Sequence, residues 1–128
     1  MSRKSKGINA ERDLIHKFWS KDWACIRVAG SGSMRYPSSD ILASNKLRRL
    51  AIECKTSGEK NRYLTKEEVQ QLKTFAELFG AEPWVAIKFD RKGWFFLTLD
   101  DLEDSGSNFV ISSERVMNKG LLFEELIK

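Results

Sequence analysis

The stretch "SSDILASNKLRRLAIECK", residues 38–55, has the pattern of a β-hairpin, yet charged residues stand where its strands should pack. Strand side chains alternate in direction, so Glu53 and Lys55 share one face of the second strand. With the turn at 45–48, Asp40 falls opposite Glu53 or one diagonal step away. Isolated buried charges are costly unless they are paired or bind a metal. The hairpin therefore predicts that these three charges converge on one site.

Helical and strand periodicities surround this hairpin. Thr65 and Glu68 form a capping box that predicts the start of a helix, and Gly80 predicts its end. The order of elements indicates one mixed β-sheet flanked by helices, an α/β fold. We expect helices over 9–22 and 65–80, strands over 24–28, 39–43, 47–55, 83–89 and 93–99, an extended piece over 108–112, and a short helix within 121–128.

The segment "GWFFLTL", residues 93–99, is apolar on both of its faces. A strand of this kind needs a second covering layer, which a helix or a partner subunit can supply. Five large rings are concerned, namely Trp84, Phe89, Trp94, Phe95 and Phe96. We expect them to lie mostly in the core, and we expect some of the large rings to form a dimer surface.

Charge divides the chain unevenly. Residues 1–99 hold 19 of the 22 Lys and Arg and 11 of the 18 Asp and Glu, a net +8, whereas 100–128 carries a net −4. A basic body suits a polyanion such as nucleic acid, although a soluble protein of high pI is equally consistent with charge alone. We expect one domain over 1–128, with a mobile basic arm at 1–6 and an acidic extension at 100–128.

Membrane and secretory features are missing from the sequence. There is no apolar run of membrane-spanning length and no apolar stretch of a secretory signal near the start. Cys25 and Cys54 lie in apolar strand segments without metal-ligand or CxxC spacing. We expect a cytoplasmic protein that has two reduced cysteines and no association with a membrane.

The converging acids favour metal-dependent chemistry. Asp40 and Glu53 offer hard carboxylate oxygens suited to Mg²⁺ or Mn²⁺, and the backbone carbonyl of Cys54 is a further candidate ligand. Glu11 begins the apolar stripe of the first helix, so we expect it to face the sheet and to ligate the metal directly or through water. Lys55 is placed to orient a water or to stabilise charge on a phosphoryl group. The set suits phosphodiester hydrolysis, whereas the alternative is an exposed Glu53–Lys55 ion pair.

Basic residues border the predicted site on loops and strand ends. As a group they favour DNA binding, although any single one is equally consistent with a solubilising surface. The long loop at 30–36, "GSGSMRY", is flexible enough to become ordered on a nucleic acid. The candidate DNA-binding residues are Arg27, Ser31, Ser33, Arg35, Lys46, Arg48, Arg49, Lys60, Arg62 and Lys66.

A known family shows the same motifs in the same order. Asp40 followed by "ECK" at 53–55 resembles the PD-(D/E)xK nuclease core. The series "GINAERDLIHKFW", "IRVAGSGS", "IECK", "YLTKEEVQQLKTFAELFG" and "WVAIKF", within residues 6–99, resembles the archaeal Holliday-junction resolvases known as Hjc. This resemblance implies a restriction-endonuclease-like nuclease core and a homodimer. It further implies a Mg²⁺-dependent endodeoxyribonuclease that binds four-way DNA junctions and cuts two opposing strands symmetrically in recombination and repair.

The resemblance also implies roles for individual residues. Glu11, Asp40, Glu53 and Lys55 fall on the catalytic positions of the family, and Ser31 falls on a serine that its members use at the active site. The loop that contains Ser31 is implied to enter the junction.

Two positions depart from the family pattern. Pro37 stands two places earlier than the proline of the "PD" pair. The family commonly has a polar residue such as Gln at the position of Glu68, to which we assign only the capping box. The alternatives to a resolvase are a related nuclease acting on duplex or flapped DNA and a non-catalytic DNA-binding module. No motif identifies an accessory partner such as a sliding clamp.

Overall fold

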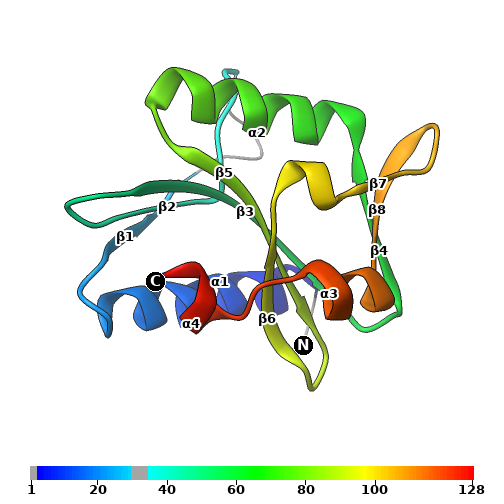
Figure 1. Ribbon diagram of the computed structural model, residues 1–128, viewed down its shortest axis with the longest axis horizontal. Helices are drawn as coiled ribbons and strands as arrows, with labels where there is room; N and C mark the ends of the chain where they lie inside the picture. Colours follow the sequence, from blue (N-terminus) through cyan, green and yellow to red (C-terminus); the bar gives the residue numbers. More distant parts are fainter. Residues whose placement is uncertain (1–2, 30–34) are drawn as a thin grey trace.

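A computed structural model describes residues 3–29 and 35–128 of the chain, and its elements form two sheets with helices around them (Figure 1). In chain order the elements are α1 (Arg3–Trp19), β1 (Ala24–Arg27), β2 (Ile41–Ser44), β3 (Arg49–Ser57), β4 (Asn61–Thr65), α2 (Lys66–Phe79), β5 (Glu82–Phe89), β6 (Gly93–Leu97), the 3₁₀ turn η2 (Leu99–Asp101), β7 (Glu103–Asp104), β8 (Asn108–Ser112), α3 (Ser113–Lys119) and α4 (Phe123–Leu126).

The larger sheet has five strands in the order β1-β2-β3-β5-β6, and the smaller sheet has three in the order β4-β8-β7. Strands β3 and β5 pair in parallel, whereas the other neighbours in the larger sheet are antiparallel. The predicted mixed sheet flanked by helices is therefore confirmed. In Figure 1, α2 covers one face of the larger sheet, and α1 and α4 lie on the other.

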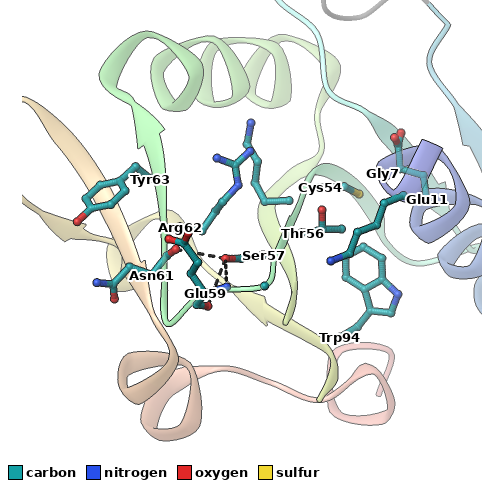
Figure 2. Close-up of a pocket in the computed structure, with 13 residues that line it drawn as sticks. Gly7, Glu11, Cys54, Thr56, Ser57, Glu59, Asn61, Arg62, Tyr63 and Trp94 are labelled. Carbon is teal, nitrogen blue, oxygen red and sulfur yellow. Dashed lines mark hydrogen bonds between the residues drawn. The ribbon is translucent and has the colours of Figure 1, made fainter. Parts of the chain in front are cut away.

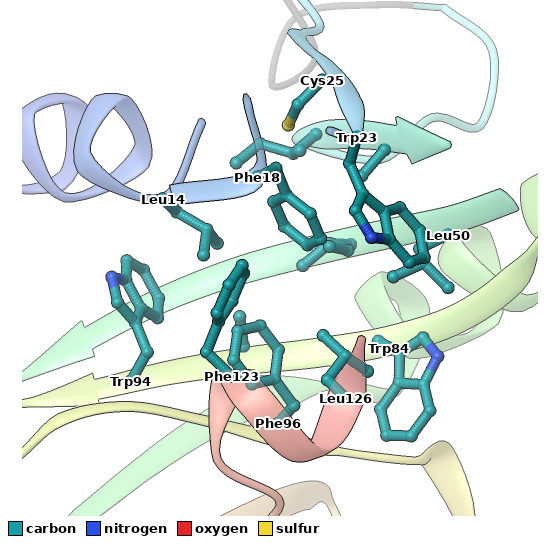
Figure 3. Packing of buried hydrophobic residues seen from close by; sticks show 14 of the residues in the cluster. Leu14, Phe18, Trp23, Cys25, Leu50, Trp84, Trp94, Phe96, Phe123 and Leu126 are labelled. Atoms are coloured by element: carbon teal, nitrogen blue, oxygen red, sulfur yellow. The ribbon is translucent and has the colours of Figure 1, made fainter. Parts of the chain in front are cut away.

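The face under α1 and α4 forms one of two apolar clusters (Figure 3). Leu14 and Phe18 of α1 lie fully buried there, and the ring of Phe18 is 5.0 Å from that of Phe123 on α4. Strand β3 contributes Leu50 and Ile52 to the same cluster, as its alternation predicts. The first helix is therefore fixed directly over the strand that carries the predicted site.

The opposite face packs against α2. Thr65 caps this helix by accepting a hydrogen bond from the Glu68 amide at 3.0 Å, and the Glu68 side chain accepts one from the Thr65 amide at 3.0 Å. Gly80 ends the helix with a left-handed φ of 79°. Both predicted signals of this helix are confirmed, and the apolar stripe between them packs on β3 and β5.

Several predicted boundaries were wrong. The first helix begins at Arg3 rather than at residue 9, so the proposed arm at 1–6 is helical from Arg3 onward. Strand β4 begins and helix α3 lies in segments for which we predicted neither a helix nor a strand. The acidic segment 100–128 is packed into the body of the protein, because Ile111 and Phe123 are buried in the two clusters.

The covering layers bury the aromatic residues that we considered for a dimer surface. Trp84, Phe89, Trp94, Phe95 and Phe96 each have at most 8% of their surface exposed. They therefore belong to the core of this chain, and the expectation that some of them line an interface was wrong for the chain as described. Among the described residues, no helix is long and apolar enough to cross a membrane.

Candidate active site

Asp40 lies where the hairpin pattern predicts. Ile41 pairs with Ile52, so Asp40 directly precedes β2 and stands opposite Glu53. Its carboxylate Oδ2 accepts a hydrogen bond from the Cys54 amide at 2.8 Å, and its own amide donates to the Ile52 carbonyl at 3.0 Å. The backbone of β3 thus fixes the Asp40 carboxylate beside Glu53.

Glu53 is largely buried, with 17% of its side chain exposed. Burial raises its pKa to about 8, and the negative charge of Asp40 adds to this effect. The Lys55 ammonium, whose Nζ is 3.6 Å from Glu53 Oε2, acts in the opposite direction. A carboxyl with this pKa is mostly protonated at neutral pH. The nearby positive charge of Lys55 is therefore not enough to keep both Asp40 and Glu53 ionised.

Glu11 joins the same group of charges from α1. Its carboxylate lies 3.5 Å from Arg27 Nε on β1. Burial raises the pKa of Glu11, the charge of Asp40 raises it further, and Arg27 opposes both. Glu11 therefore faces the sheet close to Asp40, as the helical stripe predicts, and the sequence had assigned its partner Arg27 only to DNA.

The Cys54 side chain packs against the cluster under α1, within reach of the charges of the three acids. Burial raises the pKa of its thiol, and the charges of Asp40, Glu11 and Glu53 raise it further, in that order. The thiol therefore stays protonated at neutral pH when no metal ion is bound. The role of the Cys54 backbone carbonyl stays a prediction.

Lys55 has a second and shorter contact that the sequence did not predict. Its Nζ donates to Glu68 Oε2 at 2.5 Å, and only 14% of the Lys55 side chain is exposed. Burial acts to raise the pKa of Glu68, but hydrogen bonds from Lys55 and from the Thr65 amide outweigh it and lower that pKa. Glu68 thus caps α2 with one oxygen and holds Lys55 with the other. In the sequence, Glu68 directly precedes the buried Val69 near the start of α2. This position indicates that its side chain lies near the sheet, and it is the sequence signal from which the contact with Lys55 could have been predicted.

We expect Glu68→Ala to lower the rate of DNA cleavage about tenfold, since a hydrogen bond to a charged group is worth about 1.5–3 kcal/mol. Glu68→Gln should keep most activity, because its amide oxygen can still accept from Lys55 while glutamine also serves in a capping box. Single-turnover cleavage measures both variants, and Glu67→Ala on the exposed side of the same helical turn is the control. Equal rates for the two Glu68 variants would contradict a positioning role.

The predicted DNA-binding residues divide into two groups. Lys46 and Arg48 lie in the β2–β3 turn and Arg49 is the first residue of β3, at the end of the strand opposite to Lys55. Arg48 is bound within the fold, because it donates two hydrogen bonds of 2.8 Å to Glu82 and contacts the Leu126 carbonyl at 2.5 Å. The structure therefore assigns Arg48 a role in holding the chain together.

The remaining basic residues differ in what they contact. Lys66 pairs with Asp104 at 2.6 Å, and its Nζ lies 4.1 Å from the ring centre of Phe109. Lys60 and Arg35 are exposed, and Arg62 lines a pocket. Ser31 and Ser33 lie outside the described residues.

A pocket of about 610 Å³ adjoins the converging charges. It extends from Lys6 and Glu11 on α1, past Lys55 on β3, to Arg62 on β4, with Trp94 also in its lining (Figure 2). This volume is within the range of small-molecule pockets. Glu11 and Lys55 of the candidate site therefore open onto a cavity large enough for part of a substrate.

The acids suit a divalent cation, although no ready-made cage is present. Within residues 3–29 and 35–128, no three His, Cys, Asp or Glu side chains are grouped closely enough to hold a metal ion. Mg²⁺, however, usually takes only one or two protein carboxylates and keeps several waters. Asp40 and Glu53 supply two adjacent hard donors, and the raised pKa of Glu53 shows that positive charge would stabilise the pair. The donor set therefore fits such an ion.

Known proteins resemble this chain over nearly its whole length. The family described as archaeal Holliday junction resolvase (Hjc) matches residues 2–128. A protein of Archaeoglobus fulgidus named crossover junction endodeoxyribonuclease Hjc is 47% identical over 123 residues, covering 96% of this chain and 90% of that protein. A protein of the same name from Methanocaldococcus jannaschii is 36% identical over 122 residues, covering 95% of this chain and 86% of that protein.

A solved structure shows the same similarity in three dimensions. The 1.6 Å structure of Archaeoglobus fulgidus Hjc, described as a Holliday junction resolvase from an archaeal hyperthermophile, superposes with a TM-score of 0.90 at 42% identity. The alignment covers 95% of this chain and 100% of the other. The nuclease-core fold implied by the sequence motifs is thereby confirmed.

Proposed function

Because this chain belongs to the archaeal Holliday junction resolvase family, we propose that it is a structure-selective endonuclease that hydrolyses two opposing strands of a four-way DNA junction. The observation that carries this proposal is that Glu53 and Glu11 both approach Asp40, with Lys55 beside Glu53. An exposed ion pair does not account for it, since these side chains are largely buried and lie beside a pocket.

Each residue of the site has a distinct task in this proposal. Asp40 and Glu53 hold a divalent cation, which we take to be Mg²⁺ with Mn²⁺ as a substitute, and Glu11 takes part directly or through water. The ion, when bound, supplies a Lewis acid at the scissile phosphate. Lys55, held by Glu68, donates to the attacking water or to a phosphoryl oxygen. Ser31 remains part of this proposal by its place in the family motif.

Cleavage of a four-way junction and of a linear duplex, side by side with and without Mg²⁺, tests the proposal. We expect paired nicks in opposing strands of the junction only, and only with the metal. Equal cleavage of both substrates would favour a nuclease acting on ordinary duplex DNA. Binding without any nick would favour a non-catalytic DNA-binding module.

A homodimer is also part of the proposal, because two equivalent sites related by a two-fold axis suit two symmetric cuts. The exposed apolar side chains on the C-terminal turn of α2 support a dimer interface at that turn. It exposes Leu78 by 85% and Phe79 by 50%, and the Phe79 ring stacks on Phe75 with centres 5.3 Å apart. Adjacent large apolar side chains of this kind are typical of interface centres. A cytoplasmic location also belongs to the proposal.

We expect Phe79→Asp to convert the dimer to a monomer at micromolar concentration, because a charge at the centre of an apolar interface loses its hydration. Sedimentation velocity measures the change, and Leu47→Asp in the exposed β2–β3 turn is the control. A Phe79→Asp protein that sediments as the unaltered dimer would place the interface elsewhere.

A further inference from the structure

The pocket beside the candidate active site contains two buried hydrogen-bond donors that have no acceptor. They are Nε of Arg62 and Nε1 of Trp94, and neither has a partner among the described residues. Both residues line the same cavity as Lys55 and Glu11. Because nearly all buried polar groups in folded proteins are satisfied by protein atoms, water or a ligand, two such donors in one pocket mark a place where a group that carries acceptors can bind.

Strand alternation directs Arg62 into the molecule. On β4, Asn61 and Tyr63 are exposed, whereas Leu64 is buried and Arg62 is half-buried. The guanidinium group keeps its charge at any ordinary pH. Among the described residues Arg62 forms no ion pair, unlike Arg48, which binds Glu82. A positive charge therefore faces the pocket without a counter-ion.

Trp94 differs from other tryptophans of the chain. Trp19 donates its indole N–H to the Cys25 carbonyl at 2.9 Å, and Trp84 donates to Glu82 at 3.2 Å. Trp94 is only 6% exposed, and its N–H has no acceptor within the described chain. The buried indole thus adds a second unpaired donor to the lining of the pocket.

The chemistry of the lining favours an anion with several oxygen acceptors. Lys6, which pairs with Asp90, and Lys55, which pairs with Glu68, place ammonium groups on the lining beside the unpaired guanidinium of Arg62. Of the two carboxylates on the lining, Glu11 is paired with Arg27, and Glu59 is exposed to solvent. Figure 2 places Arg62 and Trp94 on opposite sides of the end of β3, so an elongated ligand would cross that end. Lys55 of the same strand also lines this pocket.

We propose that this pocket binds the cleaved DNA strand, with Arg62 contacting the phosphate that flanks the scissile bond and the Trp94 N–H contacting an acceptor of the neighbouring nucleotide. This inference rests on the proposed function, because it takes the ligand to be the strand that the adjacent acids cut. Phosphodiester oxygens are hydrogen-bond acceptors that can pair with the two unpaired donors, Arg62 Nε and Trp94 Nε1. A DNA strand supplies such acceptors on both sides of the cut. Arg62 and Trp94 thus set the path of the strand through the site.

Synthetic junctions with one neutral methylphosphonate at successive phosphates around the mapped cut test this assignment. With the unaltered protein, a methylphosphonate at one of the phosphates that flank the cut should lower the rate of single-turnover cleavage about tenfold. This is the size of effect expected for loss of a charge-assisted hydrogen bond. Arg62→Gln should show a similar loss on the unmodified junction and no further loss at that position. Lys92→Gln, which removes an exposed positive charge outside the pocket, should behave like the unaltered protein.

Trp94→Phe keeps a buried ring but removes the N–H, and we expect it to lower cleavage several-fold while a thermal unfolding scan shows a folded protein. If the unaltered protein cuts the junction but Arg62→Gln keeps full sensitivity to the flanking methylphosphonate, the subsite is wrong and the endonuclease stands. If no junction is cut, the proposed function and the subsite fail together. Binding of a polyglutamate peptide that Arg62→Gln abolishes, with the scan unchanged, would assign the pocket to an acidic protein segment.

Discussion

Asp40→Asn is expected to lower Mg²⁺-dependent cleavage of a four-way junction by about 10³-fold or more, since Lewis-acid stabilisation is worth several kcal/mol and each 1.4 kcal/mol is about tenfold. The asparagine oxygen can still accept the hydrogen bond from the Cys54 amide, which is 2.8 Å long in the native site. The backbone geometry is therefore kept while the charge that attracts a cation is lost. Single-turnover cleavage with saturating protein measures the effect.

Junction binding is the second readout for this variant. We expect the affinity of Asp40→Asn for the junction without metal to be unchanged or slightly higher, because a negative charge has been removed. Asp13→Asn is the matched control, since it makes the same change at an exposed carboxylate on α1. If Asp40→Asn cuts at the rate of the control, Asp40 has no part in catalysis.

In the absence of metal, the protein should lose stability as the pH rises toward 8. Burial and the charge of Asp40 raise the folded-state pKa of Glu53 from 4.5 to about 8. The folded state therefore holds a proton that the unfolded chain releases near pH 4.5. A pKa difference of one unit corresponds to about 1.4 kcal/mol. Between pH 5 and pH 8 the free energy of unfolding should fall by on the order of 4 kcal/mol from this residue.

Urea denaturation in EDTA at pH 5 and at pH 8, compared with Glu53→Gln, isolates this effect. Glutamine does not titrate, so the variant should lack the loss, and any contribution of Glu11, whose pKa is also raised, remains in both proteins. Millimolar Mg²⁺ should restore much of the stability of the unaltered protein at pH 8, because it stabilises the ionised pair. Parallel pH curves for the two proteins would mean that Glu53 is ionised throughout.

The hairpin was the most predictable part of the molecule, and the reason is geometric. Side chains of a strand alternate with a period of two, so the turn at residues 45–48 sufficed to place Asp40 opposite Glu53. Glu11 was placed by the same kind of argument, since helical spacing put it at the head of a buried stripe. Both predictions needed only the periodicity of side chains along a single strand or helix and, for the hairpin, the register with the strand next to it.

Contacts between elements distant in the sequence were not predictable in the same way. The Lys55–Glu68 pair depends on how α2 lies over β3, which no local pattern fixes. Strand β4 was missed because only Leu64 among its five residues is buried, too few to establish an alternation. Helix α3 was missed because Val116 is the one buried residue among its seven, so the segment shows no helical spacing of apolar residues.

The packing of α4 has a consequence for the order in which parts of the molecule become packed during synthesis. Phe123 packs against Phe18, and Leu121 pairs with the backbone of Phe96, so residues near 123 complete the layer that holds α1 over β3. A ribosome adds these residues after every residue of the candidate site. A partly synthesised chain therefore carries Glu11, Asp40 and Glu53 before the Phe123 ring covers Phe18. The apolar cluster under α1 is completed only when α4 has been synthesised, so the α1 side of the candidate site is the last part of the molecule to become fully packed.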